Sequence, residues 1–226
     1  MVKTRLAVFD CDGTLVDSEA SIVAAMQGAF AVHGLAEPTA KAVRRVIGLP
    51  LKEAVAGLLP DADDIDHDKL TAGYKEVFSD LRRRGRVLDP LYPGALEAIL
   101  ELAASNVWLL GVATGKSRRG LLETLDRHGI RERFVTLQTS DIGPGKPHPD
   151  MLLRAIAESG AEAATTVMIG DTTFDIEMAR RAGVMAIGVS WGYHDGKELL
   201  AAGADALIDD FGDLFKAAET LMEAAL

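Results

Sequence analysis

Residues 6–14 read Leu-Ala-Val-Phe-Asp-Cys-Asp-Gly-Thr, and this stretch decides the fold. The apolar run 6–9 predicts a buried strand, and Asp10 and Asp12 follow where that strand ends. Two carboxylates about 4 Å apart repel each other by roughly 4 kcal/mol at an effective dielectric near 20. The pair therefore predicts a proton or a divalent metal between the two acids. The alternative is an Asp-rich turn, because Asp and Gly are common turn residues.

Length and composition limit the kind of protein. The chain has 226 residues, 48% of them hydrophobic, which is enough for one large domain or for a domain with an insertion. A net charge of −10 argues against nucleic-acid and membrane partners, because both need Lys and Arg to neutralise phosphates. The run 6–9 is too short for a signal peptide. The single cysteine, Cys11, excludes an intrachain disulfide, so we expect a cytoplasmic protein.

The order of apolar segments predicts an α/β fold. Further strands are expected at residues 108–113, 134–137, 166–169, 185–189 and 206–208, with helical patterns between them and a last amphipathic helix over 211–226. This order is typical of a parallel sheet wrapped by helices, whose ligands bind outside the carboxyl ends of the strands. Because Asp10, Thr114 and Asp171 each follow a predicted strand, we expect them to share one rim.

The first two strands are separated by a long helical segment, with helices expected at 19–33, 40–46, 51–59 and 66–84. A compact insertion is the simplest account: residues 1–16 and 87–226 form a catalytic core, and residues 17–86 form a helical cap over the site. The alternative is that these helices belong to the main core. The basic run from Arg82 to Arg86 is expected to be the solvated end of a helix.

Two segments supply groups that favour phosphate. Residues 112–117, Val-Ala-Thr-Gly-Lys-Ser, place the Thr114 hydroxyl and a row of backbone N–H groups, beginning with Gly115, at the start of a helix. An ordinary N-cap, with Thr114 or Ser117 bonding its own helix, explains this stretch equally well. Lys146 lies in a loop whose path Gly and Pro fix, so it can neutralise both a phosphoryl group and a nucleophile.

A second acidic pair follows the predicted strand at 166–169. Asp171 and Asp175 are four residues apart, so they face the same side if a helix begins here. Hard oxygen donors without His or Cys indicate Mg²⁺, which takes one or two carboxylates, waters and substrate phosphate. Asp171 as a simple helix cap is the alternative.

The acids at the first strand suggest phosphoryl chemistry. Asp10 is the candidate nucleophile, because a carboxylate can attack phosphorus and form an aspartyl phosphate. Asp12 is the candidate general acid that protonates the leaving oxygen, and afterwards the base that activates water.

Taken together, four segments resemble the haloacid dehalogenase superfamily, in its branch related to phosphoglycolate phosphatase and β-phosphoglucomutase. They are FDCDGTLVDS with Asp10 and Asp12, VATGKS with Thr114, GKPHPDM with Lys146, and GDTTFDIEMA with Asp171 and Asp175. The resemblance implies a Rossmann-like core with a helical cap. It also implies Mg²⁺ bound by Asp10, the backbone carbonyl of Asp12 and Asp171, with Asp175 nearby, and phosphoryl oxygens held by Thr114 and Lys146.

The expected function is that of a magnesium-dependent phosphatase acting on a small phosphorylated metabolite. The superfamily's dehalogenases lack the second acid of the first motif, so Asp12 argues against dehalogenation. The mutases carry a histidine and a basic residue where this chain has Ile22 and Leu51, so a sugar-phosphate mutase is the alternative. A signalling domain built like a response-regulator receiver, or a phosphate-binding protein without catalysis, is a further alternative.

Overall fold

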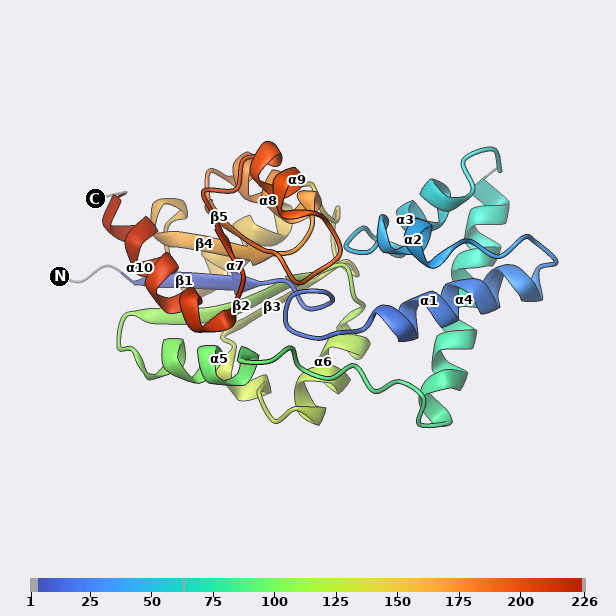
Figure 1. The fold of residues 1–226 in the computed structure, drawn as a ribbon, viewed down its shortest axis with the longest axis horizontal. Coiled ribbons are helices and arrows are strands. Elements are labelled where there is room, and N and C mark those ends of the chain that lie inside the picture. The colour runs from blue at the N-terminus through green and yellow to red at the C-terminus, as the bar shows by residue number, and fades with distance from the viewer. Residues whose placement is uncertain (1–3, 63, 225–226) are drawn as a thin grey trace.

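A single parallel sheet forms the centre of the protein. The computed structural model describes residues 4–62 and 64–224 and is drawn in Figure 1. Within these residues the strands are β1 (Arg5–Phe9), β2 (Trp108–Thr114), β3 (Thr136–Thr139), β4 (Thr166–Gly170), β5 (Met185–Val189) and β6 (Ala206–Ile208). They pair in the order β3-β2-β1-β4-β5-β6, and every pairing is parallel. The predicted α/β class is confirmed.

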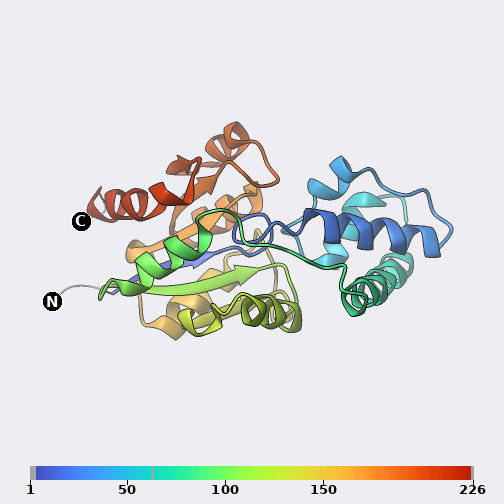
Figure 2. The same cartoon turned by 60° about the horizontal axis from the view of Figure 1, so that its bottom comes forward.

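Helices cover both faces of the sheet (Figure 2). On one face pack α5 (Ala95–Ala104), α6 (Arg118–Arg127) and α10 (Leu214–Ala224). On the other pack α7 (Asp150–Ser159), α8 (Thr173–Ala182) and α9 (Gly196–Ala202). Short 3₁₀ turns at Arg131–Arg133, Ala163–Thr165 and Phe211–Asp213 complete the core.

Strand β1 explains why the opening motif is so apolar. Its side chains alternate between the two layers: Leu6 and Val8 pack beneath α7 and α8, whereas Ala7 and Phe9 face α5 and α6. A parallel strand buried on both faces reads as a continuous hydrophobic run. Cys11 continues the second set and is fully buried, pointing away from the acids on either side.

Two predicted boundaries were wrong. Strand β3 begins two residues after the expected 134, because Phe134 ends a 3₁₀ turn and packs edge-on against Phe9, with ring centroids 6.3 Å apart. Pairing with β2 starts only at Gly111 and Thr136. The helix expected over 211–226 is a 3₁₀ turn followed by α10, and residues 225–226 lie outside the described part of the chain.

The helical insertion between β1 and β2 forms a separate lobe, called the cap below. It contains α1 (Glu19–Val32), α2 (Ala40–Arg44), α3 (Leu51–Leu58) and α4 (Asp64–Arg83), close to the predicted ranges. The cap has its own apolar cluster, which includes Met26, Phe30, Val43 and Val55. In both cartoons it lies at the end of the sheet remote from the two termini (Figures 1 and 2). Among the described residues, no helix is long and apolar enough to cross a membrane.

Candidate active site

The site lies where the order of strands along the chain reverses, between β1 and β4. Strand β1 is flanked by β2 and β4, so the carboxyl ends of these three strands meet beneath the cap. Asp10 directly follows β1, Thr114 ends β2, and Asp171 directly follows β4. The predicted common rim is therefore present, at the switch point where open α/β sheets bind ligands.

A buried lysine links two of the acids. Lys146 Nζ lies 2.8 Å from Asp10 Oδ1 and 2.6 Å from Asp175 Oδ1. The side chains of Lys146 and Asp175 are completely buried, and that of Asp10 is 1% exposed. The backbone N–H of Cys11 also donates to Asp10 Oδ1, at 2.6 Å, whereas Asp10 Oδ2 has no hydrogen-bond partner. One oxygen of Asp10 is thus fixed while the other is left for a ligand.

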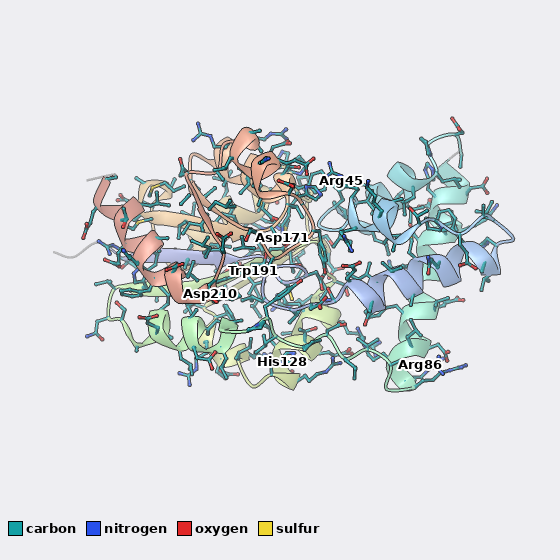
Figure 3. The ribbon with its side chains drawn as sticks, viewed as in Figure 1. Arg45, Arg86, His128, Asp171, Trp191 and Asp210 are labelled. Atoms are coloured by element: carbon teal, nitrogen blue, oxygen red, sulfur yellow. The ribbon has the colours of Figure 1, made fainter. Side chains whose placement is uncertain are left out.

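Asp171 is held from two sides. The Thr14 hydroxyl donates to its Oδ1 at 2.7 Å, and the backbone N–H of Tyr193 donates to its Oδ2 at 2.9 Å. Gly13 passes directly over this carboxylate with a φ of +86°, and any Cβ there would collide with Asp171 Oδ2. The glycine of the first motif is therefore required both by its left-handed backbone and by this close approach. Figure 3 labels Asp171 at the end of the sheet that faces the cap.

The second acidic pair converges although Asp171 and Asp175 do not lie on one helix. Helix α8 begins only at Thr173, so Asp171 precedes the helix and does not cap it. Thr172 is the N-cap residue, and Asp175 Oδ2 accepts from its backbone N–H at 3.0 Å and from its hydroxyl at 2.7 Å. This capping box aims the other oxygen of Asp175 at Lys146.

Asp10, Asp171 and Asp175 form an acid cluster that fits a metal ion. One oxygen from each lies within 4.8 Å of those of the other two. Three carboxylates against the single Lys146 ammonium leave a formal charge of −2. Burial raises the pKa of Asp10 to about 7, with Lys146 opposing the rise, and burial also raises the pKa of Asp171. A divalent cation would supply the missing charge, and the unpartnered Asp10 oxygen suits a hard metal.

Asp12 belongs to a separate group of polar side chains. Lys116 Nζ lies 2.8 Å from Asp12 Oδ1, and both side chains are at least nine-tenths buried. The Ser18 hydroxyl donates to the same oxygen at 2.6 Å and lies 3.1 Å from the hydroxyl of Tyr193. The sequence analysis did not predict a role at the site for Lys116, Ser18 or Tyr193. One sequence signal could have identified Lys116: it directly follows Thr114 and Gly115 in the segment expected to bind phosphate.

Thr114 and Gly115 line the same cavity as Asp10 and Asp12. The N-cap of α6 is Ser117, whose hydroxyl accepts from the N–H of Gly120. Thr114 therefore does not cap this helix. The backbone N–H of Lys116 donates to the Thr114 hydroxyl oxygen at 3.1 Å. Ser140 fixes the loop by donating to the Gly115 carbonyl at 2.7 Å.

The cap touches the core around the site. Arg45 of the cap lies 2.6 Å from Glu198 at α9, and Arg45 faces the core in Figure 3. The loop 48–50 rests on the catalytic loops, because a Cβ added to Gly115 would come within 2.8 Å of the Gly48 carbonyl oxygen. Asp10, Asp12, Thr114, Gly115 and Lys116 line a cavity of about 580 Å³ between cap and core.

One surface expectation was wrong. Arg82 is not part of a solvated helix end: it pairs with Glu123 of α6, stacks 5.2 Å from the Phe78 ring and lines the cavity. Its neighbours from Arg83 to Arg86 are exposed, as predicted.

Comparisons with known proteins agree with this geometry. Residues 7–189 match the family model described as haloacid dehalogenase-like hydrolase. The chain is 36% identical to "Probable phosphatase IndB" of Dickeya dadantii over 96% of this chain and 95% of that protein. It is 31% identical to phosphoglycolate phosphatase of Vibrio cholerae, over 96% and 97%. A solved hydrolase from Pseudomonas syringae superposes with a TM-score of 0.83 at 27% identity, over 96% and 99%.

Proposed function

Because this chain belongs to the haloacid dehalogenase-like hydrolases, we propose that it hydrolyses small phosphorylated metabolites through a phosphorylated Asp10. Within the family it is a phosphatase, that is, a phosphoric monoester hydrolase. One observation carries the mechanism: Asp10 is buried at the cavity, with one oxygen held by Lys146 and the other without a hydrogen-bond partner. Such a carboxylate is fixed in direction and still able to form a new bond.

The first step transfers the phosphoryl group to the protein. The Asp10 carboxylate attacks phosphorus, an aspartyl–phosphorus bond forms, and the bond to the ester oxygen breaks. Asp12 gives its proton to the departing oxygen. We assign Thr114 and the backbone N–H of Gly115 to the phosphoryl oxygens, since both line the cavity at the start of α6.

The second step returns the protein to its starting form. Asp12 accepts a proton from water, the water oxygen attacks phosphorus, and the bond to Asp10 breaks to release phosphate. Lys116 and Ser18 keep Asp12 in place for both steps through their contacts with Oδ1. Lys146 holds Asp10 and opposes the charge that gathers around it.

The metal that we propose is Mg²⁺, held by Asp10, Asp171 and Asp175, with the backbone carbonyl of Asp12 as a further predicted ligand. When bound, it neutralises charge between the carboxylate and the phosphate and so lowers the cost of their approach. The atoms that the acid cluster offers to a metal are all carboxylate oxygens, which supports a hard cation.

Three further expectations belong to this proposal. The cap comprises residues 17–86 and the catalytic core residues 1–16 and 87–226, of which 1–3 and 225–226 lie outside the described part. The substrate is a small phosphorylated molecule of the cytoplasm. Ile22 and Leu51, which line the cavity as apolar side chains, support hydrolysis over the mutase reaction.

The decisive test is the Asp10→Asn variant. We expect it to bind Mg²⁺ weakly and to lose turnover of phosphate monoesters altogether, because an amide cannot accept the phosphoryl group. The exposed Asp61→Asn of the cap is the matched control and should keep wild-type kcat/KM. Near-normal turnover in Asp10→Asn, measured by phosphate release with Mg²⁺ present, would show that Asp10 is not the nucleophile.

A further inference from the structure

The walls of the cavity point to the kind of substrate. We propose that the alcohol released by this enzyme is uncharged and carries an apolar or aromatic ring, and is therefore larger than the two-carbon acid of phosphoglycolate. This inference rests on the proposed phosphatase function and adds the class of leaving group. The cavity of about 580 Å³ lies within the range of about 300–1,000 Å³ that accommodates drug-sized ligands.

Part of the cavity wall is apolar. It is built by the cap from Ile22, Met26, Val43, Ile47, Leu49 and Leu51. Val43 is fully buried and Met26 is 2% exposed, so these side chains form a fixed surface shared with the core of the cap. An anionic group placed against this wall would lose its water without gaining a partner, which is costly. A hydrocarbon surface there is favourable.

The cations at the cavity are mostly engaged already. Lys116 pairs with Asp12, and Lys52 lies 2.9 Å from Asp68. Arg82 and Arg119 both contact Glu123. The fifth cation, Lys75, is exposed on α4. A carboxylate on the leaving group would meet either a cation that already has a carboxylate partner or the exposed Lys75, where a solvent-exposed ion pair contributes little. A neutral group disturbs none of the pairs.

Helix α4 adds two aromatic rings and a buried hydroxyl without a partner. Tyr74 and Phe78 stack with centroids 5.7 Å apart at an interplanar angle of 28°, and both line the cavity. One turn earlier, the Thr71 hydroxyl also lines the cavity and is buried without a hydrogen-bond partner. Arg82 and Lys116 already lie over the Phe78 ring, 5.2 Å and 5.9 Å from its centroid, so a ring of the leaving group would pack against the parts of the Tyr74–Phe78 pair that line the cavity. One hydroxyl or carbonyl of that group would reach Thr71.

The test compares esters whose alcohols are of similar reactivity. Benzyl phosphate, ethyl phosphate and phosphoglycolate are assayed with the full chain and Mg²⁺, and kcat/KM is measured for each. We expect benzyl phosphate to exceed both others by about tenfold or more, since a few buried carbons give discrimination of that size. Phe78→Ala should remove most of this preference, judged by the ratio of kcat/KM for benzyl phosphate to kcat/KM for ethyl phosphate, whereas Phe78→Leu should retain part of it. The exposed Glu76→Ala on the same helix is the control.

The possible results distinguish a wrong leaving-group class from a wrong phosphatase assignment. If phosphoglycolate is turned over as well as or better than benzyl phosphate, the leaving-group inference is wrong and the phosphatase proposal stands. A preference for benzyl phosphate that survives Phe78→Ala unchanged also overturns the role of the two aromatic rings. If the wild-type enzyme hydrolyses none of the three esters, the proposed function fails, and the inference fails with it.

Discussion

Closure of the cap over the site can be tested at one contact between two loops. Gly145, next to Lys146, packs against Pro50 of the cap loop 48–50. A Cβ at residue 145 would come within 2.9 Å of Pro50 Cδ and closer still to Pro50 Cγ. Gly145 does not have a positive φ, so alanine is compatible with its backbone. Gly145→Ala should therefore disturb the closed arrangement without straining the core.

The size of the effect follows from these distances. Ordinary van der Waals contact begins near 3.4 Å, so the cap loop must retreat by at least 0.5 Å (3.4 minus 2.9) to clear Cδ, and further to clear Cγ. Because a misplacement of about 1 Å can lower a rate by about 100-fold, we expect kcat/KM to fall by about 10- to 100-fold. This corresponds to about 1.4–2.7 kcal/mol of transition-state stabilisation. The free energy of unfolding should change by less than about 1 kcal/mol, as is usual for compatible Gly-to-Ala changes.

A double-mutant cycle checks the cause. Pro50→Ala removes the two colliding carbons and leaves a Cβ at 3.4 Å, so alone it should change kcat/KM by about twofold at most. Gly145→Ala with Pro50→Ala should recover the activity of Pro50→Ala. The assay is kcat/KM for benzyl phosphate, with urea unfolding of all four proteins beside it. Additive losses, or full activity in Gly145→Ala alone, would refute the reasoning.

Two further predictions concern the charged groups. Lys116→Met leaves Asp12 nine-tenths buried without its ion-pair partner, so urea unfolding should show a loss of about 3 kcal/mol together with lower kcat, and unchanged stability would contradict the pairing. Removing Mg²⁺ with a chelator should abolish turnover, and adding it back should raise the Tm of the wild type, because a ligand that binds only the folded state stabilises it. The Tm of Asp171→Asn should not respond to Mg²⁺, and an equal rise there would argue against the acid cluster as the metal site.

The acid cluster was predictable because the backbone builds it. Once the apolar runs are identified as parallel strands, residues that follow them must meet at one edge, whatever lies between them in sequence. Asp10, Thr114 and Asp171 are brought together for this reason. Lys146 was predicted only because Gly and Pro fix the path of its loop. Its ion pairs with both Asp10 and Asp175 became evident only in the structure.

Contacts that depend on the direction of long side chains were not predictable. Lys116, in the loop after β2, pairs with Asp12, in the loop after β1. The pattern of apolar residues in a strand does not show in which direction such a long side chain points. Arg82 turns inward because α4 crosses the cavity next to Glu123, although the arginines that follow it are exposed. The sequence leaves the start of α8 open because Asp171 and Thr172 are both residue types that cap helices, and only the structure shows that Thr172 closes a capping box with Asp175.

Tyr193 gives the boundary between cap and core a practical meaning for protein engineering. It belongs to the loop after β5, far from residues 17–86 in sequence, yet its ring completes the apolar cluster of the cap. Its backbone N–H meanwhile holds Asp171, and its hydroxyl lies beside Ser18. A chimera that exchanges caps between related enzymes must therefore transplant position 193 together with the inserted helices, or the graft will lack a piece of its own interior.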